Sequence, residues 1–255
     1  MRLVSGGFLA IVPALNEVGA VGQTVREIKQ SAPQFDVLVV DDGSTDETAT
    51  AAARAGAAVV TLPFNLGIGG AMQAGYMYAR EHGYGVAVQV DGDGQHDARY
   101  IPELLARLEQ DASLNMVTGS RFLEPVDGGY TSSAARRAGI RLFASIVSFV
   151  SRQHVTDPTS GFRMTDRRGI ELFARDYPHD YPEVEAILLM HAHRLRSAEI
   201  PVVMRRRTTG SSAISTFQAG YYMVKVLLAV FVGVFRAKPH RVPGQDPPVA
   251  AERSL

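Results

Sequence analysis

The sequence contains no cysteine, which excludes disulfide bonds and metal sites built on thiolates. Long apolar runs are also scarce near the start. The run within MRLVSGGFLAIVPALNE is about five residues long, which is too short for the apolar core of a secretory leader. We therefore expect a first buried strand there and a cytoplasmic protein.

The chain has no net charge, because 26 Lys and Arg balance 26 Asp and Glu over 255 residues. The charges are unevenly spread. Residues 1–120 hold 7 basic and 14 acidic side chains, and residues 121–255 hold 19 and 12. We interpret the first half as suited to a cation and the second as suited to an anion, such as a phosphate or an acidic membrane surface. The alternative is that the two surfaces simply complement each other.

Short apolar runs alternate with helical patterns through residue 120. The predicted strands and helices are Leu9–Val12, Val18–Gln30, Val37–Val40, 46–55, Ala57–Leu62, Gly67–Arg80, Gly85–Val90, Pro102–Gln110 and Asn115–Thr118. Ser44 or Thr45 is positioned to cap the second of these helices. This alternation predicts an α/β fold with a mostly parallel, Rossmann-like sheet flanked by helices.

Polar clusters follow three of the predicted strands: Asn16-Glu17, Asp41-Asp42 and Asp91–Asp97. Ligands of parallel sheets bind at the carboxyl ends of the strands. We therefore expect these clusters to converge on one site.

The second half is less regular. Its predicted elements are a basic amphipathic helix over Ala134–Ser151, a loop over Asp157–Arg163, a helix over Glu183–Arg194, a strand over Ala198–Met204 and an apolar helix over Phe217–Phe235. The Pro-rich, charged residues 237–255 are predicted to be disordered.

The segment VQVDGDGQHD carries the sharpest chemical signal. A buried strand delivers Asp91 and Asp93 into a turn containing Gly92 and Gly94, and Gln95 follows. Two carboxylates and an amide are hard oxygen ligands, which suit Mg²⁺ or Mn²⁺ held together with substrate phosphates. The alternative is an Asp-Gly turn with solvated acids. His96 alone is a poor candidate for a metal ligand.

Each of two other segments could either bind a ligand or stabilise the local structure. Asp41-Asp42-Gly43-Ser44 could hold a ribose or base, or cap a helix. The glycines of NLGIGG permit close approach of a ligand, but the segment lacks the Gly-Lys-Ser/Thr ending of a phosphate-binding P-loop. Glycine-rich helix packing is the alternative there.

Seven motifs in order resemble family 2 glycosyltransferases with a GT-A fold. They are IVPALNE, VVDDGSTDET, NLGIGGAMQAG, VDGDGQHD, GSRF, DPTSGFR and the RxxGxS pattern at 207–212. The polyprenyl-phosphate branch, which includes dolichol-phosphate mannosyltransferase, is the most similar group. The resemblance spans about residues 8–216, and GSRF with DPTSGFR points to the lipid-phosphate branch.

The resemblance implies roles for the matching positions. Those expected to bind the nucleotide sugar are Pro13, Ala14, Leu15, Glu17, Asp41, Asp42, Asp91, Gly92, Asp93 and Arg207. Asp91, Asp93 and Gln95 would meet the metal, Mg²⁺ or Mn²⁺. The acceptor phosphate would be held by Arg121 and Arg137, with Arg141, Arg163 and Ser212 as further candidates. The family often has Lys after that Ser, where this chain has Ala213; Arg205 and Arg206 are candidates to substitute for it.

The implied reaction is inverting transfer of a hexosyl group from a UDP- or GDP-sugar to a polyprenyl phosphate. Asp93, Asp157 and Arg121 are the candidate catalytic residues. Asp157 is a candidate general base. Its alternative roles are an ion pair that orients Arg137 or Arg163, or a loop cap before Pro158.

A lipid acceptor implies a bilayer nearby. Phe217–Phe235 approaches the spanning length of about 20 residues, but Lys225 lies near its middle. We therefore expect residues 217–236 to lie on the cytoplasmic membrane surface; packing on the core or in a dimer is the alternative.

The expected organisation is a catalytic domain over 1–216, with a donor half (1–120) and an acceptor half (121–216). An integral membrane partner or a homo-oligomer would complete it, and no nucleic acid is expected.

Three other functions compete with this one. A transferase with a soluble acceptor would show no lipid dependence. A nucleotidyltransferase would need basic residues after the first strand, and PALNEVGAVGQ has none. A non-catalytic module that binds nucleotide sugars would not need Asp91, Asp93 and Arg207 intact.

Overall fold

The computed structural model describes residues 6–123 and 134–205, and of residues 134–140 it describes only the backbone. The elements in chain order are β1 (Phe8–Ala14), α1 (Val21–Ser31), β2 (Phe35–Asp41), α2 (Thr48–Arg54), β3 (Ala58–Thr61), α3 (Gly67–Glu81), β4 (Val86–Gln89), a 3-10 turn η1 (Ala98–Tyr100), α4 (Ile101–Gln110), β5 (Leu114–Ser120), α5 (Ala134–Ser151), β6 (Arg163–Asp166), α6 (Arg167–Arg175), α7 (Pro182–Ala192) and β7 (Arg196–Pro201).

The seven strands form one sheet in the order β3-β2-β1-β4-β6-β5-β7. Strands β3, β2, β1 and β4 are parallel, and so are β5 and β7. Strand β6 runs antiparallel to both neighbours, β4 and β5. The predicted sheet, mostly parallel and flanked by helices, is confirmed. The apolar helix and the tail expected beyond residue 216 lie outside the described residues.

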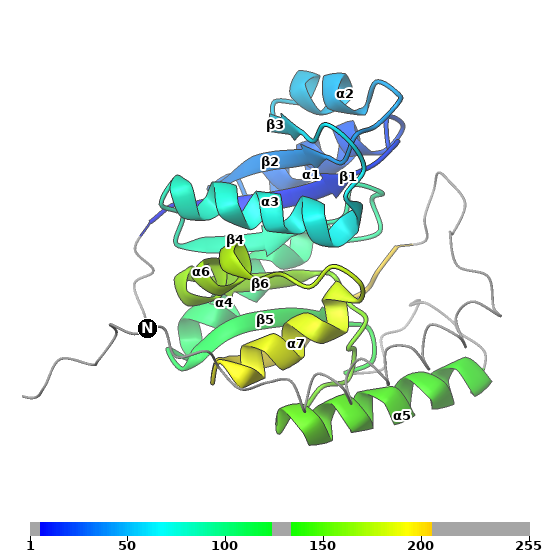
Figure 1. Cartoon of the computed structure of the whole chain (residues 1–255), viewed down its shortest axis with the longest axis vertical. Helices are drawn as coiled ribbons and strands as arrows, with labels where there is room; N and C mark the ends of the chain where they lie inside the picture. The colour runs from blue at the N-terminus through cyan, green and yellow to red at the C-terminus, as the bar shows by residue number, and fades with distance from the viewer. Residues whose placement is uncertain (1–5, 124–133, 206–255) are drawn as a thin grey trace, which may run out of the picture.

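Helices cover both faces of the sheet (Figure 1). On one face, side chains of α1 and α4 pack on β1, β2 and β4 around Val25, Ile28 and Leu104. On the other, α3, α6 and α7 pack around Tyr76, Phe173 and Met190. The continuous apolar strands of the first half reflect this burial on both sides.

The sequence analysis predicted neither strand β6 nor helix α6 in the second half of the chain. The strand reads RMTD, and all four side chains are buried. Arg163 and Thr165 are polar, so the segment lacks the apolar run typical of a central strand, and its start was expected to end a loop. Met164 joins the core on the α1–α4 face, which holds the strand in place.

Strand order reverses at β1, between β2 and β4. The connection after β1 leads to β2 on one side, and the connection after β4 leads to β5 on the other, which opens a crevice at the carboxyl ends of these strands. The three polar clusters expected to converge all lie at this edge.

Candidate functional site

A cavity of ≈ 340 Å³ opens at the carboxyl ends of β1, β2 and β4. Its lining residues are Pro13, Ala14, Leu15, Glu17, Asp42, Asn65, Gly67, Ile68, Ala71, Asp91, Gly92 and Asp93. Eight of the ten positions expected to bind the nucleotide sugar are in this set. Asp41 is not, and Arg207 lies outside the described residues. The convergence expected from the sequence is therefore present.

The loop after β1 is held by the loop after β2. The backbone N–H of Asn16 donates to Ser44 Oγ (2.9 Å), and the N–H of Glu17 donates to Thr48 Oγ1 (2.9 Å). Thr45 in turn donates its N–H to Asn16 Oδ1 (2.9 Å). The expectation that Ser44 or Thr45 caps α2 is wrong, because both side chains bond Asn16 instead. The side chain that bonds a backbone N–H at the start of α2 is Asp46, which accepts the N–H of Thr48 (3.0 Å).

The two acids at the end of β2 have different surroundings. Asp41 is buried, and its Oδ1 accepts the N–H of Ser44 (3.1 Å), so it fixes the turn. Asp42 lines the cavity and accepts the N–H of Leu66 (2.7 Å), which ties β2 to the loop before α3. Gly43 follows Asp42 with φ 75°, and a Cβ added there would meet the backbone of Phe64 at 2.9 Å.

Asp91 is held at both its backbone and its carboxylate. Its N–H donates to His96 Nδ1 (3.0 Å), and His96 Nε2 lies 3.5 Å from Asp91 Oδ2. Gln89 Nε2 donates to Asp91 Oδ1 (3.1 Å). His96 is buried and stacks on Phe162 at 4.9 Å. The ring of His96 thus orients a metal-ligand candidate, a role that the sequence analysis did not assign to it.

The residues present fit a hard divalent cation. Both Asp91 and Asp93 border the cavity, and Asp93 Oδ1 accepts the N–H of Gln95 (3.0 Å). A carboxylate offers about four lone-pair sites, so these bonds leave capacity for a metal. Over residues 6–123 and 134–205, no group of three or more His, Asp or Glu is placed to hold a metal ion. A cation here would need oxygens from a substrate diphosphate, as Mg²⁺ commonly does.

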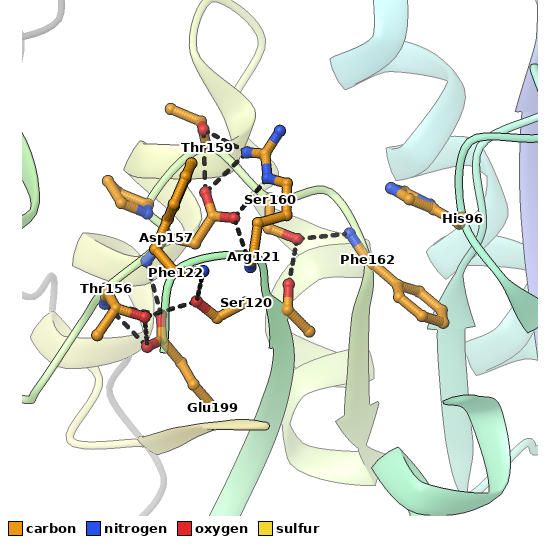
Figure 2. Close-up of polar contacts among 12 residues, drawn as sticks. His96, Ser120, Arg121, Phe122, Thr156, Asp157, Thr159, Ser160, Phe162 and Glu199 are labelled. Carbon is orange, nitrogen blue, oxygen red and sulfur yellow. Dashed lines mark hydrogen bonds and ion pairs between the residues drawn. The ribbon is translucent and has the colours of Figure 1, made fainter. Parts of the chain in front are cut away.

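Arg121 and Asp157 form a two-bond ion pair (Figure 2). Asp157 is fully buried, and it also accepts the backbone N–H of Arg121 (3.1 Å). Burial would raise the pKa of Asp157, but the hydrogen bonds and charge of Arg121 outweigh it and hold the pKa below its ordinary value. Asp157 is therefore a weak base. Its described partner is Arg121. Arg163, which the sequence analysis considered, bonds the carbonyl of Pro158 instead, and the side chain of Arg137 lies outside what the structure describes.

A second carboxylate, Glu199 on β7, holds the loop that carries Asp157 (Figure 2). It accepts the N–H of Thr156 (2.8 Å), the hydroxyl of Thr156 (2.6 Å) and the N–H of Asp157 (3.1 Å). The sequence analysis missed Glu199. A single acid in a strand carries no motif, and its partners lie 42 and 43 positions away.

The DPTSGFR loop joins the two halves of the site. At its start, Asp157 holds Arg121. Near its end, Gly161 faces the metal-ligand candidate: a Cβ added there would lie 3.5 Å from Asp91 Oδ1 and 2.8 Å from Gln89 Nε2. Ser160 anchors the loop by donating its hydroxyl to the carbonyl of Gly119 (2.6 Å). One short segment thus contacts both the Asp91 region and Arg121.

The structure describes the side chains of two other expected acceptor residues, Arg163 and Arg141. Arg163 is buried in β6; its Nη2 donates to the carbonyl of Pro158 (3.4 Å), and its Nε and Nη1 have no partner within the described part of the chain. Arg141 is exposed on α5. Arg205 pairs with Glu27 (2.6 Å) and Asp97 (3.1 Å). The side chain of Arg137, and all of Arg206 and Ser212, lie outside what the structure describes.

Glu183, in the first turn of α7, is a further charged group near both halves. Burial raises its pKa, and the charges of Arg163 and Arg121 offset part of that rise, whereas the charge of Asp91 adds to it. These influences place Glu183 in the electrostatic field of the whole site.

Comparisons with known proteins agree with this arrangement. Residues 9–173 match glycosyl transferase family 2. The chain is 29% identical to the undecaprenyl-phosphate mannosyltransferase of Micrococcus luteus, covering 86% of this chain and 91% of that one. It is 30% identical to the polyprenol monophosphomannose synthase of Mycolicibacterium smegmatis, over 86% and 84%.

The fold is also found in a solved structure of glucosyl-3-phosphoglycerate synthase from Mycobacterium tuberculosis in complex with Mn²⁺, UDP and glucosyl-3-phosphoglycerate. The TM-score is 0.66 at 19% identity, covering 90% of this chain and 80% of that one. The likeness is one of fold. The family match over residues 9–173 shows that this chain belongs to glycosyl transferase family 2.

Proposed function

We propose that the protein transfers a hexosyl group, with inversion, from a nucleotide-diphosphate sugar to a polyprenyl phosphate at the cytoplasmic face of a membrane. One observation carries the proposal. The DPTSGFR loop bonds Arg121, a phosphate-binding type of residue, through Asp157, and its Gly161 lies against Asp91, which borders the cavity together with Asp93. The names of the Micrococcus and Mycolicibacterium relatives support the lipid-phosphate acceptor.

The donor would occupy the cavity. Leu15, Glu17 and Asp42 would contact the base and ribose. Gly92, which packs closely on the carbonyl of Pro13 and lines the cavity, would lie beside the diphosphate. Asp91, Asp93 and Gln95 would hold Mg²⁺ or Mn²⁺, which when bound neutralises charge on the leaving diphosphate. The similar fold solved with Mn²⁺ and UDP supports this assignment. Arg207 would close over the diphosphate.

The acceptor would bind on the Arg121 side. A guanidinium makes paired, charge-assisted bonds to phosphate oxygens, and Asp157 holds that of Arg121 in a fixed orientation. Arg137 and Ser212 would add contacts. Arg163 is buried and would act on the acceptor phosphate through its positive charge.

The reaction needs no strong base. A phosphate monoester has a second pKa of about 6, so its oxygen is already a dianionic nucleophile near neutral pH. That oxygen forms a bond to the anomeric carbon. The bond from this carbon to the nucleoside diphosphate breaks, and the diphosphate leaves with the electron pair. We assign Asp157 to orienting Arg121, with general-base catalysis as the alternative.

A panel assay tests the proposal. The full chain is incubated with UDP-glucose, UDP-N-acetylhexosamine or GDP-mannose, with Mn²⁺ or Mg²⁺, and with a polyprenyl phosphate. We expect a glycolipid from one donor and none without metal. Transfer to a soluble acceptor alone, or binding of donors without any turnover, would refute the proposed acceptor or the proposed catalysis, respectively.

A further inference from the structure

Helix α5 carries apolar side chains on two opposite sides. Phe143 and Val147 are buried, and they join a core cluster with residues of α7. On the other side, Leu142 is 62% exposed and Phe149 is 87% exposed, with the half-buried Ile146 between them. Large apolar side chains that lie exposed on one side of a helix commonly mark an interaction surface. The protein covers only one side of α5 within the described residues.

The charges around this helix have one sign. From Ala134 to Thr156 the sequence has four arginines and no Asp or Glu. Arg141 adjoins Leu142, Arg152 follows the end of the helix, and both are exposed. Exposed Leu and Phe beside arginine are typical of helices that lie in the interface of an anionic bilayer.

Helix α5 is fixed to the loop that holds the acceptor-side arginine. Ser148 Oγ accepts the N–H of Val155 (3.0 Å) and donates to the carbonyl of Val155 (3.0 Å). Val155 is buried, and Asp157 follows two residues later. Figure 1 shows α5 at the margin of the molecule, beyond α7. A bilayer that contacts the outer side of α5 would therefore lie on the Arg121 side of the site.

We propose that Leu142, Ile146, Phe149, Arg141 and Arg152 form a docking surface for an anionic lipid bilayer. This inference rests on the proposed lipid-phosphate acceptor and names the surface that brings the site to it. It adds a contact to the one expected from residues 217–236. The described helices include none that is long and apolar enough to cross a bilayer.

Vesicle co-sedimentation of the full chain tests the apolar part. The vesicles are phosphatidylcholine alone or mixed with phosphatidylglycerol. The double variant Leu142→Ser/Phe149→Ser should bind the mixed vesicles roughly tenfold more weakly than the wild type. Met77→Ser removes an exposed apolar side chain from α3 and should bind like the wild type. Unchanged binding of the double variant would overturn the docking surface.

The charged part predicts a salt effect. Arg141→Gln/Arg152→Gln should lose most of the preference for anionic vesicles, and added salt should weaken wild-type binding. Arg168→Gln, an exposed arginine on α6, is the matched control. Equal binding of the wild type to neutral and anionic vesicles would contradict the assigned charge complementarity.

Two further measurements separate this inference from its rivals. A water-soluble, short-chain prenyl phosphate without vesicles tests the chemistry alone. Wild type and the Leu142→Ser/Phe149→Ser variant should glycosylate it equally, and failure of both would count against the proposed function instead. Sedimentation velocity tests a second copy as the occupant. A dimer that the double variant converts to monomer, with vesicle binding unchanged, would assign the surface to self-association.

Discussion

Arg121 and Asp157 lie 36 positions apart in the sequence, yet Nε and Nη2 of Arg121 approach Oδ2 and Oδ1 of Asp157 to 2.7 and 2.8 Å. Side-chain hydrogen bonds of this kind fix the plane of a guanidinium. The pair therefore defines where a phosphate can be bound on the acceptor side of the site.

Removing the charge of Asp157 should affect the acceptor more than the donor. For Asp157→Asn, we expect KM for the polyprenyl phosphate to rise about tenfold, because Arg121 loses its charged partner. KM for the nucleotide sugar should change little. Thr159→Val removes the neutral bond to Arg121 Nη2 (2.8 Å) and the hydroxyl bond to Asp157 Oδ1 (3.1 Å) but leaves the ion pair in place, so it should have a smaller effect. Steady-state kinetics with each substrate varied measures both.

Asp157→Asn also distinguishes a role of Asp157 in orienting Arg121 from a role as general base. If Asp157 were the base, Asp157→Asn would lower kcat by roughly a hundredfold or more while leaving the acceptor KM unchanged. Activity close to that of the wild type at saturating acceptor removes the base assignment.

The pair should also make stability depend on pH. Because the pKa of Asp157 is lowered in the folded chain, the unfolded chain binds a proton more readily at acid pH. The stability from this group is therefore fully present above its ordinary pKa of 3.8 and is lost as pH falls through the lower, folded value. Denaturant unfolding of wild type and Asp157→Asn should show a stability difference that shrinks below that pH. A constant difference would contradict the shift.

Glu199→Gln should disturb the loop that carries Asp157. The variant keeps the size of the side chain but loses one carboxylate oxygen and turns an amide N–H₂ toward the donors of Thr156 and Asp157. We expect a loss of about 1–3 kcal/mol in the free energy of unfolding and a raised acceptor KM. Glu81→Gln, on a largely exposed 3.9 Å pair, is the control and should change neither. A stability loss with an unchanged acceptor KM would limit Glu199 to a structural role.

Gly161→Ala tests how closely the DPTSGFR loop approaches the metal-ligand candidate. The added methyl would meet Gln89 Nε2 at 2.8 Å and displace it from Asp91. We expect kcat/KM for the donor to fall about tenfold, with a small change in Tm. Gly22→Ala adds a methyl at an ordinary contact of 3.5 Å and serves as the control. Unaltered donor kinetics in Gly161→Ala would show that the Gln89–Asp91 contact is dispensable.

The first half of the fold could be predicted because its strands are continuous apolar runs that end in acidic clusters. Strand topology then brings Glu17, Asp42 and Asp91 to one edge without further information. Strand β6 could not be found this way, since its arginine and threonine are buried only because β4 and β5 flank them.

The contacts between residues of the site could not be predicted from the sequence either. GSRF and DPTSGFR each indicated phosphate chemistry, but nothing in their spacing joins Arg121 to Asp157 or Glu199 to Thr156. Both contacts depend on β5, β6 and β7 lying side by side. The contact of His96 could not be predicted for the same reason: its partner is Asp91, five positions earlier, reached because the intervening turn folds back.

The central claim is that Asp91 and Asp93 hold a metal-bound donor for transfer to a lipid phosphate. The most direct measurement is the initial rate of glycolipid formation by wild type, Asp91→Asn and Asp93→Asn, with Mn²⁺ and with a chelator. We predict transfer by the wild type with metal, none with the chelator, and a loss of about a hundredfold or more in each variant. Glycolipid formation at wild-type rates by either variant, or in the presence of the chelator, would contradict the account.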